Sequence, residues 1–425
     1  MQTPSRTRWT ILAVSYLAII GIGLPYLGWT VALPDIASDL SLNYTQAGLL
    51  SSMTALTGGI SLVLGGIATS RIGCKTIILL GLAAGIVGLL LFSIATSYPI
   101  AILARLICGI AVGLLYVGPF TMVLNWFRNT RQTGTAVGTL LTGDGVYSIV
   151  ALYLCALILM SLGWRRGLAV EAGILFAIFI VALLLLKNPP VDDTADEYAS
   201  GTVASQIFTC LKQVNVLTGT AYLVVNWGLV ALFSSWMPTI LIENAGWSES
   251  SAGLLVSLLA AGGIVTAFLF GTFSDKAGRR KLPLIFAGVA TSVAMAILTV
   301  GLALGNYGIV VVLLPIVGMA VYAGVPLAIV LAAESVDGRY AGICNGVVIG
   351  GGCLLGGFAF PYVVGLVKDL TDSFVGGMLA ATVGTFVLGF CVQLLARDSK
   401  SNEPPTRIGH DRDTAVLADP DLVNE

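Results

Sequence analysis

The chain consists of long apolar stretches separated by short polar ones. Twelve stretches approach or exceed the roughly 20 apolar residues that a helix needs to cross a lipid bilayer. They cover residues 9–31, 46–69, 76–96, 100–124, 133–160, 167–187, 215–241, 251–273, 282–304, 308–333, 341–366 and 374–395. The pattern predicts an all-α membrane protein with twelve transmembrane helices.

The polar segments divide these spans into two sets of six. Residues 188–212 contain two prolines and several acidic residues and are expected to form a solvated cytoplasmic linker. The N-terminal six-helix bundle is then expected over 1–187 and the C-terminal bundle over 213–397. Residues 398–425 are polar, carry two adjacent prolines and lack periodicity, which predicts a disordered cytoplasmic tail.

Composition agrees with a membrane protein, since 57% of the 425 residues are hydrophobic and only 10% are charged. A soluble protein needs more surface charge than this. Of the 21 lysines and arginines, only Arg165, Arg166 and Lys368 fall on one side of the predicted spans, and Arg105 falls within a span. Because basic loops stay inside, both termini are predicted to be cytoplasmic, in the inner or plasma membrane.

The side chains needed for metal or hydrolytic chemistry are scarce. The seven cysteines occur singly, and the lone histidine, His410, lies in the polar tail. We expect neither a metal site nor a cofactor, and no nucleic-acid partner. A polytopic membrane enzyme is therefore disfavoured, and a receptor would not need the internal repeat described next. The expected partners are lipid, a small-molecule substrate and protons, and the chain is expected to be monomeric.

The two sets of spans repeat each other at an offset of 205 residues. The segment starting at Ala47 matches the one starting at Ala252, and four glycines coincide: Gly48 with Gly253, Gly58 with Gly263, Gly66 with Gly271, and Gly73 with Gly278. A repeat of six spans in the same orientation suits two bundles that rock about a central cavity.

A short basic loop follows the eighth span. Its sequence resembles the cytoplasmic signature of the major facilitator superfamily, G-x-x-x-D-[RK]-x-G-[RK]-[RK], through Gly271, Asp275, Lys276, Gly278, Arg279 and Arg280. The resemblance implies a cytoplasmic gate. The alternative is a loop that is basic only because it lies inside.

The equivalent loop of the first half departs from this pattern. Ser70 stands in place of the aspartate and Cys74 in place of a basic residue, whereas Gly66, Arg71, Gly73 and Lys75 fit. The gate contact of the first half is therefore expected to be weaker or to use another acceptor.

Two charges fall inside predicted spans. Arg105, in a segment similar to the family's R-x-x-x-G-x-x-x-G, lies about 8 Å from the external end, where it must find a partner or snorkel to the surface. Asp144 lies near the membrane midplane in the fifth span. Many efflux members of the family have a proline at its position. The aspartate at this position therefore weakens the inference that the chain is an antiporter.

Asp144 and Arg105 are the residues expected to couple transport to protons. Burial penalises the charged form of a carboxyl, and a cation that comes close to it opposes that effect. A carboxyl that alternates between paired and unpaired states would bind and release a proton near neutral pH. The alternative is a structural aspartate that binds neighbouring hydroxyl groups or Arg105.

In this family the first, fourth, seventh and tenth helices line the cavity. The resemblance implies that cavity candidates on them are Tyr26, Trp29, Tyr116, Phe120, Asn226, Trp227, Phe233, Trp236 and Tyr322. Pro119 and Pro326 are expected to kink the fourth and tenth helices.

The sequence thus predicts a secondary transporter that works by alternating access, in which proton-coupled symport of a neutral, weakly polar or aromatic solute suits the lining. Two alternatives stay open. One is proton-driven efflux of amphipathic compounds, and the other is transport of a monocarboxylate or small anion bound by Arg105.

Overall fold

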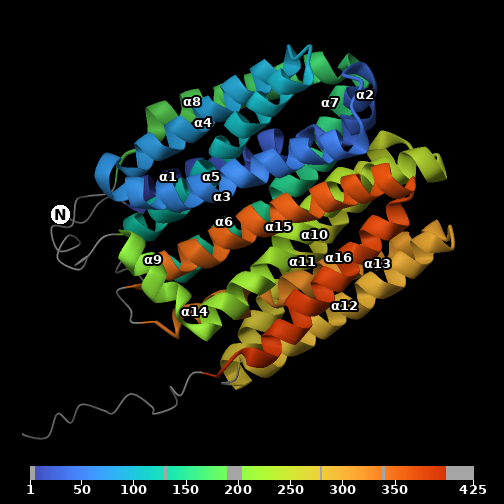
Figure 1. The fold of residues 1–425 in the computed structure, drawn as a ribbon. Helices are drawn as coiled ribbons and strands as arrows, with labels where there is room; N and C mark the ends of the chain where they lie inside the picture. Colours follow the sequence, from blue (N-terminus) through green and yellow to red (C-terminus); the bar gives the residue numbers. More distant parts are fainter. Residues whose placement is uncertain (1–4, 128–131, 189–202, 278–279, 337–339, 399–425) are drawn as a thin grey trace, which may run out of the picture.

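The computed structural model describes residues 5–127, 132–188, 203–277, 280–336 and 340–398. Within these residues the secondary structure is helical throughout (Figure 1). The elements are α1 (Ser5–Ile20), η1 (Leu24–Gly28), η2 (Thr30–Ala32), α2 (Leu33–Asp39), α3 (Tyr44–Ile72), α4 (Cys74–Ser93), α5 (Tyr98–Phe127), α6 (Thr133–Ile149), η3 (Val150–Leu154), α7 (Cys155–Leu162), α8 (Trp164–Leu185), α9 (Val203–Leu211), α10 (Val214–Ala245), α11 (Glu249–Ala277), α12 (Lys281–Ala303), α13 (Tyr307–Ala323), α14 (Val325–Ala333), α15 (Ala341–Thr371), α16 (Phe374–Phe386), η6 (Val387–Cys391) and η7 (Val392–Leu395).

The predicted spans correspond to helices of the structure. Eleven helical stretches in the described residues are long and apolar enough to cross a membrane, and α11 adds the apolar stretch Glu249–Leu259. Large side chains on the outer surface are well exposed, such as Phe286 at 63% and Leu184 at 71%. Exposed apolar side chains of this size are expected to face lipid.

The first six spans lie side by side, and the last six form a second group below them in Figure 1. We call these groups the first half and the second half. The helix ends near Ser5, Ile72, Phe127 and Ala333 share one end of the bundle, which we call the termini face. The end that carries α2 and α7 is the opposite face.

Several spans are interrupted rather than straight. The first span changes from α1 to the π-helix η1 around Pro25 and then to the 3₁₀-helix η2, which alters the hydrogen bonding of the backbone carbonyls. The tenth span breaks at Gly324, between α13 and α14, with Pro326 in the first turn of α14. The interruption lies next to Pro326, where a kink was expected, whereas α5 remains one continuous helix through Pro119.

The segment between the halves differs from a wholly solvated linker. Residues 203–211 form the helix α9, which packs against α10 and α15. Cys210 and Gln206 are buried there, while Phe208 is exposed. One face of this helix therefore belongs to the second half. Residues 189–202 and the predicted disordered tail from 399 lie outside the described residues.

Candidate functional site

The guanidinium group of Arg105 is fully buried in the first half. Its Nη1 donates a hydrogen bond of 2.7 Å to the carbonyl of Pro25, while Nη2 and Nε make longer contacts of 3.4 Å with the carbonyls of Tyr26 and Leu50. The group also lies 4.3 Å from the centre of the Trp29 ring. Arg105 thus joins α5 to the interrupted first span, and snorkelling is excluded.

The structure forms no ion pair between Arg105 and Asp144. Among the described residues, the acidic group whose charge acts on Arg105 is Glu171 of α8. The contact between Arg105 and Asp144 that the coupling hypothesis considered is absent from this conformation. The two groups have different surroundings within the first half.

Glu171 is a functional candidate that the sequence reasoning missed. It is the fifth residue of the predicted span 167–187, a position near a helix end, but its side chain is fully buried. Neither oxygen has a hydrogen bond of ordinary geometry with the described residues, although the Cys155 thiol and Arg105 lie close enough to interact with it. Arg165 pairs with Asp39 instead. The signal available in the sequence was an acidic residue within an apolar stretch.

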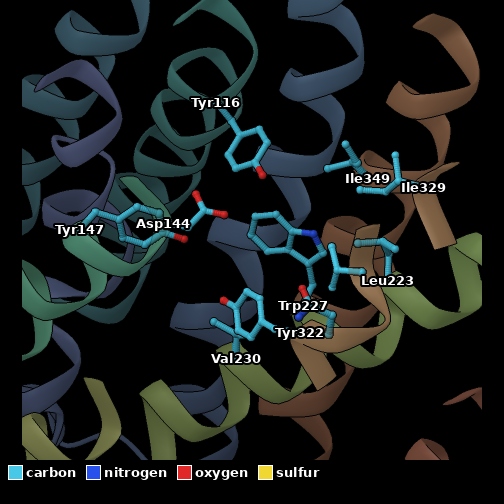
Figure 2. Close-up of a pocket in the computed structure, with 11 residues that line it drawn as sticks. Tyr116, Asp144, Tyr147, Leu223, Trp227, Val230, Tyr322, Ile329 and Ile349 are labelled. Carbon is cyan, nitrogen blue, oxygen red and sulfur yellow. The ribbon is translucent and has the colours of Figure 1, made fainter. Parts of the chain in front are cut away.

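Asp144 faces a central cavity between the two halves (Figure 2). The cavity volume is about 40 Å³, which is room for a few water molecules. The lining residues come from both halves and are Tyr116, Asp144, Tyr147, Leu223, Asn226, Trp227, Val230, Tyr322, Val325, Ile329 and Ile349. A larger solute can enter only when these side chains move apart.

The Asp144 carboxyl group is only partly satisfied. Its Oδ1 is buried without a hydrogen-bond partner among the described residues, while the Tyr116 hydroxyl faces the carboxyl group. Asn226 Nδ2 and the Tyr26 hydroxyl are also buried without a partner in this part of the chain. Because buried polar atoms normally have partners, these atoms indicate a place where water or a ligand binds.

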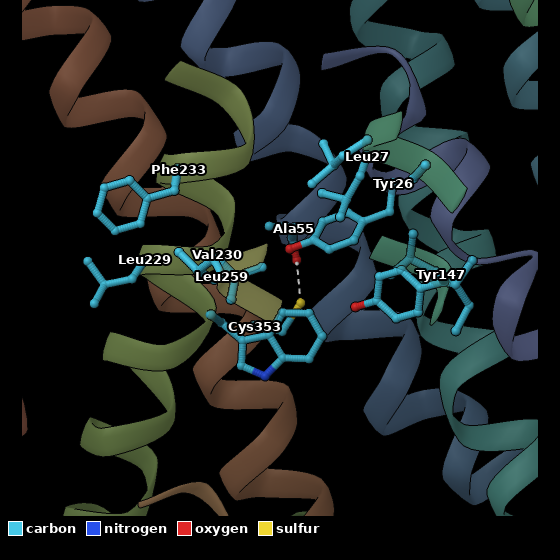
Figure 3. Packing of buried hydrophobic residues seen from close by; sticks show 14 of the residues in the cluster. Tyr26, Leu27, Ala55, Tyr147, Leu229, Val230, Phe233, Leu259 and Cys353 are labelled. Carbon is cyan, nitrogen blue, oxygen red and sulfur yellow. Dashed lines mark hydrogen bonds between the residues drawn. The ribbon is translucent and has the colours of Figure 1, made fainter. Parts of the chain in front are cut away.

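Aromatic rings surround the same space. The Trp227 ring centre lies 5.9 Å from that of Tyr116 and 6.1 Å from that of Tyr26. Next to the cavity, Tyr26 and Tyr147 extend toward Cys353 of the second half, whose thiol donates a weak hydrogen bond to the Ala55 carbonyl (Figure 3). The first span therefore reaches the interface between the halves through Tyr26.

The remaining cavity candidates from the sequence lie elsewhere. Phe120 stacks on Tyr116 with ring centres 5.4 Å apart, behind the lining. Trp29 packs against Phe92 and Arg105, and Phe233 is fully buried. Trp236 donates a hydrogen bond to the Pro361 carbonyl, toward the opposite face. Of the nine candidates, Tyr116, Asn226, Trp227 and Tyr322 line the cavity.

The first predicted gate loop connects α3 and α4 on the termini face. Gly66 and Arg71 lie in the last turns of α3, and Gly73, with a φ of 84°, makes the turn. Lys75 donates through Nζ to the Leu183 carbonyl, so this cation binds within its own half.

The second predicted gate loop is described in part. Gly271, Asp275 and Lys276 lie in the helical end of α11, and Gly278 and Arg279 lie outside the described residues. Arg280 pairs with Glu334 at 2.8 Å, and its backbone amide donates to Asp398.

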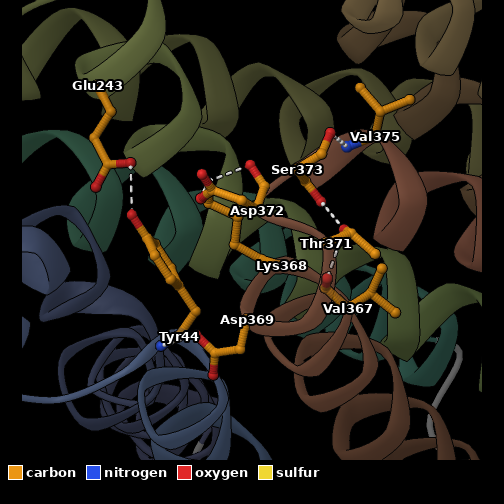
Figure 4. Close-up of polar contacts among 9 residues, drawn as sticks. All are labelled: Tyr44, Glu243, Val367, Lys368, Asp369, Thr371, Asp372, Ser373 and Val375. Atoms are coloured by element: carbon orange, nitrogen blue, oxygen red, sulfur yellow. Dashed lines mark hydrogen bonds and ion pairs between the residues drawn. The ribbon is translucent and has the colours of Figure 1, made fainter.

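The halves are joined toward the opposite face by a group of polar contacts, which we call the latch (Figure 4). The Asp369 carboxylate accepts hydrogen bonds from the backbone amides of Tyr44, at 3.0 Å, and Thr45, at 2.6 Å. It also accepts one from the Thr45 hydroxyl. The Tyr44 hydroxyl donates to Glu243 at 3.3 Å. Asp369 thus caps the first turn of α3 from the other half.

Deeper in the bundle, the halves stay in contact through small residues. Ser51 and Ser235 share a hydrogen bond of 2.6 Å, and Ser52 donates to the Phe358 carbonyl. A Cβ added at Gly138 or Gly346, nearer the termini face, would have no atom within 4 Å, and the same holds for Gly163 and Gly246 on the opposite face.

The solved structures to which this chain is similar share its fold over nearly their whole length. A bacterial homologue of the human lysosomal transporter Spinster, in an inward-facing and unoccupied conformation, superposes with a TM-score of 0.77 over 93% of this chain and 98% of that chain, at 17% identity. A D-xylose–proton symporter gives a TM-score of 0.70 over 92% of this chain and 98% of that chain, at 16% identity.

Sequence comparison gives the same kind of relative. A hexuronate transporter of Bacillus subtilis is 24% identical over 70% of this chain and 76% of its own length. A probable nitrate/nitrite transporter, NarK2, of Mycobacterium tuberculosis is 26% identical over 86% of this chain and 91% of its own. The family model for the Major Facilitator Superfamily matches residues 15–361. The chain belongs to the Major Facilitator Superfamily of membrane transporters for small solutes.

Proposed function

We propose that the protein moves its solute by alternating access and couples this movement to protons through Asp144. The observation that carries the proposal is the Asp144 carboxyl group, which faces the cavity between the halves with one oxygen unpartnered. A carboxyl group at this place can exchange a proton with either side as the halves rock. Binding of the solute and binding of the proton would then influence each other through the Asp144 carboxyl group.

We further propose that the termini face is cytoplasmic and that this structure represents an inward-facing state. Basic residues concentrate in the loops of that face, as they do in cytoplasmic loops. The latch joins the halves toward the opposite face, so that side of the cavity is the closed one in this proposal.

Arg105 has an indirect part in this proposal. It holds the carbonyls of Pro25 and Tyr26, and the Tyr26 ring contacts Trp227 of the cavity. A shift of the first span is thereby transmitted to the cavity wall. The Asp275 loop is proposed as the stronger half of the cytoplasmic gate, because Ser70 replaces the carboxylate in the other half.

Relatives that carry anions make anion transport the second candidate. Their names include a hexuronate transporter, a nitrate/nitrite transporter and a cis,cis-muconate transport protein of Acinetobacter baylyi. An anion would need a cation in the cavity. Arg105 is not among the lining residues, and its guanidinium binds backbone carbonyls. Proton-driven efflux of amphipathic compounds remains compatible with the lining.

The test is Asp144→Asn in proteoliposomes that contain a trapped pH indicator. The solutes to be added are glucuronate, nitrate, xylose and phenyltrimethylammonium. We expect at least one solute to evoke proton flux with the wild type, and the variant to lose this flux while still exchanging labelled solute supplied at a saturating concentration. Proton flux at the wild-type rate in the variant would exclude Asp144 as the coupling site. Asp35→Asn, at an exposed carboxylate of α2, is the matched control.

A further inference from the structure

The chemical groups of the cavity differ from those expected of an anion transporter, although relatives of this chain transport hexuronate, nitrate or muconate. Within the described lining, Asp144 is the sole charged side chain, and it is negative. The other polar lining groups are the hydroxyls of Tyr116, Tyr147 and Tyr322 and the amide of Asn226. Such a site would repel an anion and offers a carboxylate to a cation.

The aromatic rings have the second property that a cation needs. Tyr116, Tyr147, Tyr322 and Trp227 surround the Asp144 carboxyl group in Figure 2. Aromatic faces attract ammonium groups, and cages of them are a recurrent site for quaternary ammonium ligands. A carboxylate enclosed by aromatic rings combines charge attraction with this contact.

The unpartnered polar atoms mark where a ligand would bind. Asp144 Oδ1 and Asn226 Nδ2 belong to the lining, and the third such atom is the hydroxyl of Tyr26, whose ring contacts that of Trp227. They come from the fifth, seventh and first spans, so a ligand that satisfies them contacts both halves. Trp227 lies across this space, in contact with Tyr26 and Tyr116, and must move when a ligand enters.

We propose that the substrate is an organic cation, an amine or quaternary ammonium compound with an apolar or aromatic part, whose charge is held by Asp144 inside the ring of aromatic side chains. This inference rests on the proposed transport function and names its substrate class. It replaces the neutral solute expected from the sequence. The apolar part of the substrate would pack against the Val325, Ile329 and Ile349 side of the cavity.

A consequence is that the cation and a proton compete for one carboxyl group. The titratable groups facing Asp144 are the hydroxyls of Tyr26 from η1, Tyr116 from α5, Tyr147 from α6 and Tyr322 from α13. These phenols are neutral at physiological pH, so Asp144 alone changes charge there. Binding of a permanent cation should therefore weaken as pH falls and should release a proton.

The experiment measures binding of phenyltrimethylammonium to the purified full-length protein in detergent, by calorimetry at pH 8.5 and pH 5.5. This probe carries its charge at every pH, and benzoate and benzyl alcohol serve as anionic and neutral probes of similar size. We expect the cation to bind more tightly at the higher pH and the other two probes to bind at least ten-fold more weakly. Asp144→Asn should lose about ten-fold or more in cation affinity, and Asp35→Asn should bind as the wild type does.

Substitution of Trp227 separates the aromatic contribution from simple space filling. Trp227→Phe keeps a ring and should retain most of the affinity, whereas Trp227→Leu should lose it several-fold. Equal affinity in the two variants would overturn the aromatic part of the proposal.

The outcomes distinguish this inference from the proposed function. Absence of cation binding, or binding that is indifferent to Asp144→Asn, overturns the organic-cation assignment. If glucuronate or xylose still evokes proton flux that depends on Asp144, the coupling proposal stands without it. If the cation binds through Asp144 but Asp144→Asn leaves proton flux unchanged, the substrate class holds and the coupling role fails.

Discussion

At the scale of single residues, Arg105 shows how a cation is accommodated inside an apolar bundle. Backbone carbonyls of the first and second spans and the Trp29 ring make its direct contacts, and the charge of Glu171 acts on it without an ion pair. A guanidinium is suited to this site because its planar donors point in several directions while its face stacks on a ring.

We expect Arg105→Lys to destabilise the protein, because an ammonium cannot reach the carbonyls of Pro25 and Tyr26 and stack on Trp29 at once. The loss should be on the order of 2 kcal/mol, read as a fall in the thermal unfolding midpoint in detergent. Arg166→Lys, at an exposed position, should change the midpoint little. Equal midpoints for the two variants would contradict the anchoring role.

Residue identities predicted part of the site. Asp144 could be recognised because a carboxylate near the middle of an apolar stretch is costly, whatever its neighbours. Glu171 is also an acidic residue in an apolar stretch, but counting along the chain placed it near the end of a span, and its burial arises from how α8 packs against η1 and α7. The partners of Arg105 are backbone carbonyls, which leave no mark in a sequence.

At the scale of elements, α3 and α15 form the main contact between the halves, and glycine permits their close approach. A Cβ added at Gly59 would lie 2.8 Å from both the Gly350 carbonyl oxygen and the Leu354 amide nitrogen. Backbone atoms cannot move aside as a flexible side chain can.

Gly59→Ala is therefore expected to force α3 and α15 apart at a cost of about 1–3 kcal/mol. The variant should unfold at a lower temperature and transport more slowly. Gly138→Ala is the matched control, since its added Cβ meets open space. If the two variants behave alike in thermal unfolding, the tight packing of α3 on α15 is not what the substitution probes.

Span positions were predictable because length and hydropathy decide whether a helix can cross a bilayer. The interruptions within the spans were less predictable. Pro326 predicted the interruption at Gly324, but Pro119 predicted one that does not occur, because α5 is continuous through it. Helix α9 was missed because nine residues between polar segments are too few for a span, and its buried face depends on α10 and α15.

At the scale of the whole molecule, orientation is the first property to test. With the termini face inside, a membrane-impermeant maleimide added to intact cells should label a cysteine introduced at the exposed Thr96 and should not label one at Lys212. Permeabilised cells provide the control, because both positions should then react. Labelling of Lys212→Cys in intact cells would show that the termini face is external.

The latch predicts how the conformational equilibrium responds to a single carboxylate. Asp369→Ala removes the acceptor for two backbone amides of α3, which costs about 0.5–2 kcal/mol in the latched state and should raise the population open on the opposite face several-fold. Asp372→Asn, three residues away, is the control, because it removes the carboxylate that pairs with Lys368 while asparagine tolerates the φ of 53° at this position.

Spin labels at the exposed positions Thr96 and Asn244 would report the change as a larger fraction of long distances between them. An unchanged distance distribution in Asp369→Ala would show that the apolar contacts, and not this cap, hold that face closed.

The single carboxyl group of the cavity also affects how much of the proton gradient an empty carrier would dissipate. With a proton or a monovalent cation bound, Asp144 is electrically neutral, and the carrier can reorient at little electrostatic cost. With neither bound, a bare charge stays in a low-dielectric interior, so an empty carrier should reorient slowly and waste little of the gradient. One-for-one exchange would move no net charge, and a membrane voltage, which contributes about 2.3 kcal/mol per charge at 100 mV, should neither drive nor oppose it.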